Sequence, residues 1–376
     1  VLSGSAVALD YRANVNLRWR AFADMTGLRP FVESTKEDAF TVVRELFSPA
    51  SCAKLDRYLH NPLLSRESSV GDIAYEDDCP VGFQASILRR LYLGQNPLYG
   101  VVGGMLAMKS GGRGGAPVLL MNMMKSSIAS RDGSSFFFAN TANAVSMKMN
   151  RLLGVKGEGV DSCGTVRFAV LKVGGFLNFA LHGKLPRFLI RVADYISYGI
   201  GRAVNRSIET ERQVNIPEID VFWSSYVAAN EGVVSSRTGA EVEWAFGREI
   251  VDGKAIMVVH RKNGRVDGYA VVKESKSVPG RWLVVDWIAH KNDQQVLAEL
   301  LKSVKAHLRR DSRAFLLECI GFPMRVQDVI GRVLRFRRRA PNNSFIYQAF
   351  DKEIESAIKS DKGWFFGPYD GDRCLS

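Results

Sequence analysis

Cysteine is scarce in this 376-residue chain, and its placement excludes the chemistry that clustered cysteines provide. The five cysteines lie singly along the sequence, at Cys52, Cys79, Cys163, Cys319 and Cys374. They are odd in number and form no CxxC pair, so we expect neither a zinc site nor a disulfide framework. The pattern favours reduced thiols, a cytoplasmic location and a protein without a metal.

Long apolar runs, a leader pattern and nucleic-acid motifs are also missing. No stretch approaches the roughly 18 apolar residues that cross a bilayer. The opening VLSGSAVALDYRANVN has no basic segment followed by an apolar core, so secretion is not expected. Aromatic residues do not interleave with the basic runs, and no recognised binding motif occurs, so no nucleic-acid partner is expected.

Positive charge is abundant and unevenly placed. The net charge of +12 predicts an anionic partner, either a surface or a substrate. One basic concentration is MRVQDVIGRVLRFRRR at 324–339, and another is KLPRFLIRVADYISYGIGRAVNR at 184–206. Apolar residues in the second stretch follow helical spacing, which favours an amphipathic linker helix packed on a domain. A helix lying on a membrane surface is the alternative, which would make the protein peripheral to the membrane.

A cluster of glycines stands directly before a helix-period run. Gly111, Gly112, Gly114 and Gly115 follow an apolar stretch at 98–109 that predicts a strand, and Pro117 suits the first turn of a helix. A strand, a glycine loop and a helix aim backbone N–H groups and the helix dipole at one spot, which suits a phosphate. No GK[ST] follows, and the GxGxxG order is absent, so neither a P-loop nor a dinucleotide fingerprint is present. A flexible surface turn is the alternative.

The second half of the chain repeats the pattern of the first. GDIAYEDDCPVGFQASILRR at 71–90 and KAIMVVHRKNGRVDGYAVVKE at 254–274 both predict hairpins, with Gly82 and Gly268 opening the return strands. Each hairpin is followed by a strand and a helix, and then by one more strand and helix. A repeat near half the chain length indicates duplicated domains, not a solenoid.

This order of elements resembles the GNAT superfamily of acyl-coenzyme A N-acyltransferases. The loop motif of that family, [QR]xxGx[GA], falls on Lys109, Gly112 and Gly114, with lysine in place of Gln or Arg. A later family motif has an Asn, a small residue, a Tyr and a closing Leu-Gly-Phe. The matching residues here are Asn143, Ser146, Asn150 and Leu153-Gly154-Val155. The resemblance covers about residues 38–180 and 217–350.

The resemblance implies an α/β fold of mixed sheets, in two tandem GNAT-like domains, each with a central sheet flanked by helices. It implies a 1–37 extension, an acyl-CoA-binding domain at 38–183, a basic linker at 184–216, a degenerate domain at 217–350 and a tail at 351–376. Acetyl-CoA or another acyl-CoA and an amine acceptor are the implied substrates.

The cofactor-binding residues follow from the same resemblance. The pyrophosphate of coenzyme A would lie on Gly111, Gly112, Arg113, Gly114, Gly115 and Ala116. Leu106, Ala107 and Met108 would hold the pantetheine arm, and Asn143 and Ser146 complete the predicted set. In the second copy HKNDQQ, 290–295, has no glycine and places Asp293 at a helix entrance. We therefore expect one coenzyme A per chain, bound by the first copy.

Catalytic residues are harder to identify. Asn150 stands where many GNAT enzymes have a tyrosine acid, so the leaving thiolate must be protonated otherwise. Asp286 and His290 flank the second loop strand and are the candidate bases. An N-acyltransferase acting on a small molecule or an envelope or polysaccharide precursor is the first hypothesis. A non-catalytic acyl-CoA-binding scaffold and a Fem-like transferase using aminoacyl-tRNA are the alternatives. The tail GWFFGPYDGDRCLS is expected to dock on the core through Trp364 and Phe365.

Overall fold

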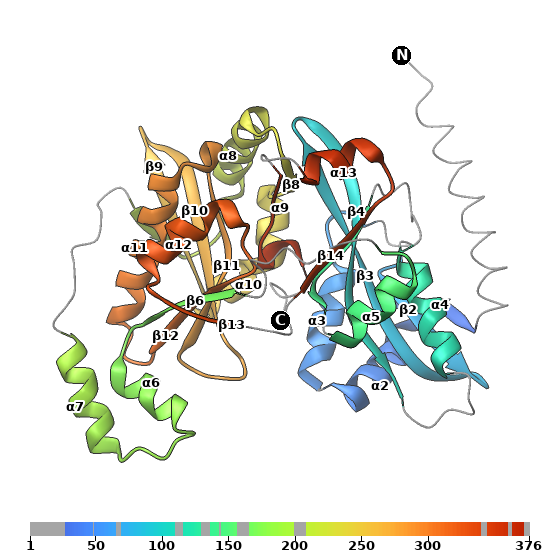
Figure 1. Cartoon of the computed structure of the whole chain (residues 1–376), viewed down its shortest axis with the longest axis horizontal. Helices are drawn as coiled ribbons and strands as arrows, with labels where there is room; N and C mark the ends of the chain where they lie inside the picture. The colour runs from blue at the N-terminus through green and yellow to red at the C-terminus, as the bar shows by residue number, and fades with distance from the viewer. Residues whose placement is uncertain are drawn as a thin grey trace.

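A computed structural model of the chain describes ten stretches of it. They are residues 27–47, 49–64, 69–109, 116–128, 136–142, 144–155, 165–198, 208–339, 344–359 and 363–371. Two mixed β-sheets stand side by side with helices packed around them (Figure 1). The expected α/β class with two mixed sheets is confirmed.

The first half builds most of one sheet. Its elements are β1 (Leu28–Pro30), a 3₁₀ turn (Glu33–Thr35), α2 (Lys36–Leu46), α3 (Pro49–Leu59), β2 (Gly71–Glu76), β3 (Cys79–Leu93), β4 (Asn96–Met108), α4 (Ala116–Ile128), β5 (Phe136–Ala142) and α5 (Ala144–Leu152). The predicted hairpin is the β2–β3 pair, which turns through Asp77 and Asp78, both with positive φ. The predicted strand and helix on either side of the glycine loop are β4 and α4.

The second half begins with strand β6 and a helical hairpin and then builds the other sheet. These elements are β6 (Thr165–Val170), α6 (Val173–Ala180), α7 (Arg187–Tyr198), β7 (Ile208–Glu211), α8 (Ile216–Ala229), β8 (Val233–Ser235), α9 (Gly239–Val242), a π-helical turn (Glu243–Gly247) and α10 (Arg248–Val251). They continue with β9 (Ala255–Lys262), β10 (Arg265–Glu274), β11 (Arg281–Ala289), η4 (His290–Asn292), α11 (Gln294–Arg310), β12 (Leu316–Ile320), a 3₁₀ turn (Met324–Val326) and α12 (Gln327–Val333). The last are β13 (Phe336–Arg339), β14 (Ser344–Ala349), α13 (Lys352–Lys359), β15 (Trp364–Phe365) and η6 (Pro368–Asp370).

The two sheets exchange strands. β6 follows the first half in sequence but lies between β12 and β13 of the second sheet. In return β14 follows the second half and pairs with β5 of the first sheet. The expected range 38–183 therefore carries one strand of the second sheet, β6, and the expected range 217–350 carries two strands of the first sheet, β8 and β14. Because each sheet is completed by the other half, neither range contains all the strands of its own sheet.

Gly82 and Gly268 occupy matching places in the two hairpins, and close packing explains both. A Cβ on Gly82 would lie 2.9 Å from the sulfur of Met108, on the neighbouring strand β4. A Cβ on Gly268 would lie 2.8 Å from the carbonyl oxygen of Ile288 on β11. A side chain at Gly268 would push β10 away from β11, whereas a side chain at Gly82 would require the flexible end of Met108 to move.

The halves share one hydrophobic core and are also joined by polar contacts. The guanidinium of Arg57, on α3, lies 2.6 Å from the carboxylate of Glu249 on α10. The indole N–H of Trp244 donates to the carbonyl of Arg57 at 2.9 Å. The tail adds β15 beside β8, with Trp364 and Phe365 buried, so the expected docking of the tail is confirmed.

Candidate functional site

Strand β4 separates from its neighbour halfway along its length. It pairs in parallel with β5 only from Gly100 to Val102, opposite Phe136 to Phe138. Beyond Val102, and as far as Met108, β4 is paired with β3 alone among the described residues. Strand β5 is paired with β14 on its other side. Met105 is a bulge at the start of this divergence, because Gln84 pairs with Leu106 and Ala85 pairs with Gly104. The parallel pairing therefore ends at Val102, before the bulge, and we call the edge of β4 from there to Met108, which has no recorded pairing with β5 among the described residues, the gap beside β4.

The backbone groups that face this gap follow from the pairing of β3 with β4. The N–H of Lys109 donates to the carbonyl of Val81 at 2.8 Å, so this pair faces inward. In an antiparallel ladder, inward-facing and outward-facing residues alternate. Ala107 consequently faces β3, and the N–H and C=O groups of Leu106 and Met108 face the gap. Of the three predicted pantetheine-binding residues, Leu106 and Met108 turn their backbone groups away from β3, and Ala107 pairs with it.

The side chains of Leu106 and Met108 pack below α4. They contact a small apolar cluster that includes Leu119, Leu120 and Met123 of that helix. This contact places the start of α4, at Ala116, close to the end of β4. The loop residues Gly111, Gly112, Arg113, Gly114 and Gly115 lie outside the described residues, as does Asn143, and the side chains of Ala116 and Ser146 are not described. Their roles stay predictions.

Two other residues singled out by the sequence have defined surroundings. Lys109 forms an ion pair with Glu45 of α2, at 2.6 Å between Nζ and Oε2. Asn150 lies near the end of α5 with its side chain buried. Its amide has no acidic proton, so the described structure provides no acid at this position.

The second half repeats the divergence. β11 pairs in parallel with β12 from Arg281 to Val284 and then continues alone on that side, with Val285 as a bulge. The N-terminus of α11, the helix that follows, is capped by a side chain of the protein. Asp293 is the N-cap of α11, and its Oδ1 accepts from the N–H groups of Gln295 at 2.8 Å and Val296 at 3.2 Å. The expected occupation of this helix N-terminus by Asp293 is confirmed. An anion bound there would be repelled by the carboxylate of Asp293.

The C-terminal segment lies where β11 and β12 separate. Its short helix η6 packs against β11. A Cβ on Gly367 would stand 2.8 Å from the ring of Phe322, which follows β12 and packs edge-on against Trp287 of β11. Arg89 of β3 holds the segment by donating to the carbonyls of Tyr369 at 3.0 Å and Gly371 at 3.3 Å. The slot of the second half is therefore filled by the protein itself.

Asp286 belongs to a buried ion-pair network in this filled slot. Its carboxylate and the guanidinium of Arg237 are both 0% exposed, and Nε of Arg237 lies 3.1 Å from each carboxylate oxygen. The hydroxyl of Tyr269 donates to Asp286 at 2.8 Å, and the backbone N–H of Trp287 donates at 3.0 Å. Asp370 of η6 lies 3.7 Å from the other side of Arg237. A base must reach its substrate, so these contacts favour a structural role for Asp286 over the predicted catalytic one.

Burial sets the ionisation of this network. Burial lowers the pKa of Arg237, but the charges of Asp286 and Asp370 oppose it and the net result is a raised pKa. Burial also raises the pKa of Tyr269 and Tyr369 well above the usual value, which keeps both hydroxyls as donors. The pKa of Asp370 is raised by burial, against the attraction of Arg237. The Arg237 guanidinium therefore stays charged.

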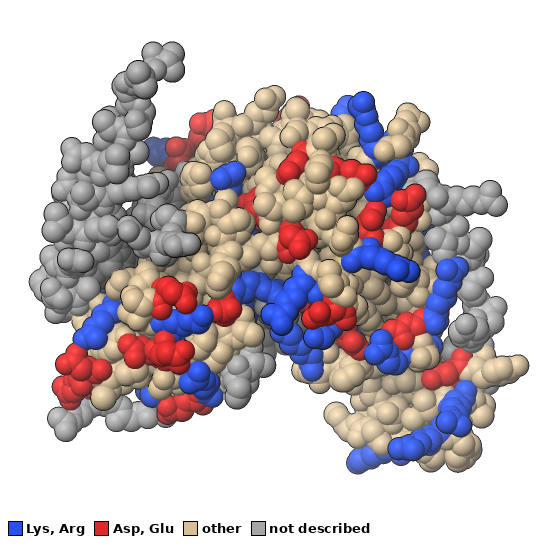
Figure 2. All heavy atoms as spheres, turned by 180° about the vertical axis from the view of Figure 1, so that it is seen from behind, with Lys and Arg blue, Asp and Glu red and all other residues tan. Residues whose placement is uncertain are grey.

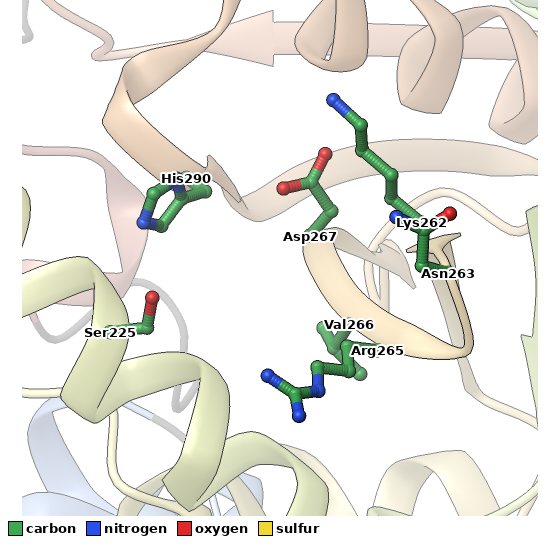
Figure 3. Close-up of a pocket in the computed structure, with 7 residues that line it drawn as sticks. All are labelled: Ser225, Lys262, Asn263, Arg265, Val266, Asp267 and His290. Atoms are coloured by element: carbon green, nitrogen blue, oxygen red, sulfur yellow. The ribbon is translucent and has the colours of Figure 1, made fainter.

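His290 lies apart from Asp286, on the wall of an open cavity of about 450 Å³. Ser225 of α8 and the β9–β10 hairpin form the rest of the wall. Figure 3 shows Ser225 and His290 on one side of the space, with Arg265, Asp267 and Lys262 of the hairpin on the other. The combination of cations and a carboxylate suits a small polar ligand. In Figure 1 the β9–β10 hairpin and α4 lie on opposite sides of the molecule, so this cavity is not part of the gap beside β4.

Comparison with known proteins establishes the fold. No protein-family model and no curated protein match the sequence. A conserved Enterococcus faecalis V583 protein, described as a probable N-acyltransferase, matches with a TM-score of 0.55 at 10% identity over 86% of this chain and 71% of that one. Saccharomyces cerevisiae N-myristoyltransferase with bound myristoyl-CoA matches with 0.54 at 12% identity over 88% of both chains. A GCN5-related N-acetyltransferase from Kribbella flavida matches with 0.52 at 12% identity over 86% and 71%. The expected GNAT-superfamily fold is confirmed.

Proposed function

We propose that this chain, whose fold is that of the GNAT superfamily, transfers an acyl group from a coenzyme A thioester to an amine. The observation that carries the proposal is the gap beside β4, where Leu106 and Met108 turn backbone N–H and C=O groups outward. The pantetheine arm is an extended chain containing amides, and such a chain binds an exposed strand edge as an added strand would. The yeast structure similar in fold holds an acyl-CoA, which supports this choice of ligand.

The phosphates of coenzyme A would bind in the same half of the chain, next to the gap beside β4. We assign them to Gly111–Ala116, between the end of β4 and the start of α4, where the helix dipole favours an anion. Arg113 adds a cation within that loop. Occupancy of the second half is opposed by Asp293 at the α11 entrance and by the tail residues against β11. The donor site therefore belongs to the first half alone.

The reaction requires a free amine and a proton for the thiolate. The amine nitrogen attacks the thioester carbonyl and the C–N bond forms. The C–S bond then breaks, the thiolate leaves, and the nitrogen gives up one proton to a base or to water. Asn150 has no proton to give as an acid, so we assign the reprotonation of the thiolate to water. The bases Asp286 and His290 stay predictions. For His290 the acceptor would have to reach from its cavity to the gap beside β4.

Calorimetry with coenzyme A tests the donor site. Met108→Pro removes the N–H group that faces the gap while leaving the ladder with β3 intact, since proline is tolerated where its nitrogen faces away from the pairing strand. We expect its Kd to rise by about tenfold or more, because a ligand carbonyl loses its donor. Met108→Ala loses a similar side chain but keeps the N–H, and it should bind within about threefold of the wild type. Equal affinities for the two variants would contradict the assignment.

Thiol release tests the chemistry separately. With acetyl-CoA or longer acyl-CoAs and a panel of amines, including envelope and polysaccharide precursors, we expect release that depends on the amine. Binding without release across the panel would instead favour a non-catalytic acyl-CoA-binding protein, the alternative that Asn150 favours. Affinity for aminoacyl-tRNA without affinity for coenzyme A would favour a Fem-like transferase.

A further inference from the structure

Exposed apolar side chains gather on the hairpin formed by α6 and α7. Eight large apolar residues with at least about a third of their surface exposed lie in this short segment: Val173, Leu177, Phe179, Leu181, Phe188, Leu189, Val192 and Tyr195. Soluble proteins rarely expose a contiguous apolar surface without a partner for it. The hairpin projects from the body below β6 and β13 (Figure 1), and Figure 2 shows the same lobe from behind, with basic side chains along its edge.

Packing fixes which side of α7 faces outward. The carboxylate of Asp194 accepts from the N–H groups of Gly174 at 2.8 Å and Gly175 at 3.2 Å, at the start of α6. A Cβ on Gly174 would stand 2.1 Å from the carbonyl oxygen of Ile190, so the two helices touch there. Ile190 and Asp194 are thus on the inner side of α7. Phe188, Val192 and Tyr195, at positions i, i+4 and i+7, form the outer stripe and are 65%, 54% and 85% exposed.

The hairpin is also anchored to the sheet. Phe176 of α6 stacks on Phe168 of β6 with ring centroids 6.2 Å apart, and Phe168 stacks on Phe336 of β13 at 5.4 Å. Phe179 packs against Phe315 at 5.6 Å. These contacts use the inner side of α6, and they hold the outer stripe of α7 in place on the surface of the folded protein.

Charge identifies the partner. Lys184, Arg187 and Arg191 are exposed, and none of the ion pairs found among the described residues involves them. Asp194 is the one acidic residue between 173 and 198, and it is turned inward onto α6. An apolar stripe bordered by cations on a helix is the arrangement that binds the surface of an anionic bilayer. No helix among the described residues is both long and apolar enough to cross a membrane.

We propose that the α6–α7 hairpin docks the protein on an anionic lipid bilayer, with Phe188, Val192 and Tyr195 in the headgroup region and Lys184, Arg187 and Arg191 against the lipid phosphates. The inference is independent of the acyl-transfer proposal, since it uses no residue of the β4 gap.

Co-sedimentation with vesicles tests the proposal. Wild-type protein should bind mixed phosphatidylcholine and phosphatidylserine vesicles and bind phosphatidylcholine alone much more weakly. Phe188→Ser with Val192→Ser should weaken binding by about tenfold or more, because two apolar side chains are lost from the interface. Arg187→Gln with Arg191→Gln should weaken binding to the anionic vesicles by about fivefold per arginine and leave binding to neutral vesicles unchanged.

Val221→Ser with Val251→Ser is the matched control, since both valines are exposed on other elements. This control should bind as the wild type does, and thermal unfolding should be unchanged in all three variants because the altered side chains face solvent. Wild-type protein that fails to sediment with anionic vesicles would overturn the proposal. So would a concentration-dependent dimer in sedimentation equilibrium that the Phe188 and Val192 variant abolishes, because a second copy would then cover the stripe.

Discussion

Replacing Arg237 by methionine tests whether the buried network of the second half holds the protein together. Methionine fills a similar volume but leaves Asp286 and Asp370 without their shared cation. The donors lost are Nε, at 3.1 Å from both oxygens of Asp286, and Nη1, at 2.7 Å from the carbonyl of Ser235. Breaking a buried ion pair by removing one partner costs about 3–5 kcal/mol. We expect Arg237→Met to lower the free energy of unfolding by that amount.

Urea unfolding followed by tryptophan fluorescence at pH 7 measures the loss. Arg313→Met is the matched control, because the Arg313 side chain is 72% exposed and its pair with Asp311 is expected to contribute less than about 1 kcal/mol. Adding Asp286→Asn to Arg237→Met should recover part of the loss, since a neutral amide costs less to bury than an unpaired carboxylate. If Arg237→Met shifts the midpoint no more than Arg313→Met does, the network does not stabilise the fold and the reasoning is refuted.

Three further outcomes follow from particular residues. Gly112→Val with Gly114→Val should abolish coenzyme A binding in calorimetry while thermal unfolding stays unchanged, and a change in Kd below about threefold would exclude the loop as the phosphate site. Asp293→Ala should lower the free energy of unfolding by about 0.5–2 kcal/mol in urea, because α11 loses its N-cap, whereas Asp293→Ser should retain most of it. Burial raises the pKa of Glu249, but the nearby cations Lys273 and Arg57 lower it by more, so the net pKa is below the ordinary value of a glutamate. Glu249→Gln should therefore destabilise the protein at pH 7, and the difference in urea midpoint should shrink as the pH falls below about 4.5.

The sequence predicted the helices and strands better than it predicted which strands pair with one another. Hairpins, the strand before the glycine loop and the helix after it follow from local spacing and turn residues such as Asp77 and Asn263, which have positive φ. The exchange of β6 and β14 was not predicted, because strand propensity does not say which sheet a strand joins. The position of Asp293 at a helix entrance was predicted, since it depends only on the residue standing before a helix, and the structure adds its N-cap hydrogen bonds.

The site residues that were predicted are likewise those marked by a local pattern, and those that depend on contacts between distant segments were missed. The backbone of Leu106 and Met108 was predicted from the resemblance, and the structure adds which groups face the gap. Arg237 was missed, because its partners Asp286 and Asp370 are distant in sequence and no local pattern marks them. Asp286 was predicted as a base from its position at a strand end, a criterion that cannot detect burial. The apolar spacing of 185–196 was visible, but packing alone decided that Phe188, Val192 and Tyr195 face outward.

The number of coenzyme A molecules bound per chain tests the central claim most directly. Native mass spectrometry of the full chain with excess coenzyme A should show one bound molecule, and Met108→Pro should remove it while Met108→Ala keeps it. The account predicts this because Leu106 and Met108 turn backbone groups away from β3, whereas Asp293 and the C-terminal segment occupy the equivalent place in the second half. Two bound molecules per chain, or one that survives Met108→Pro, would contradict it.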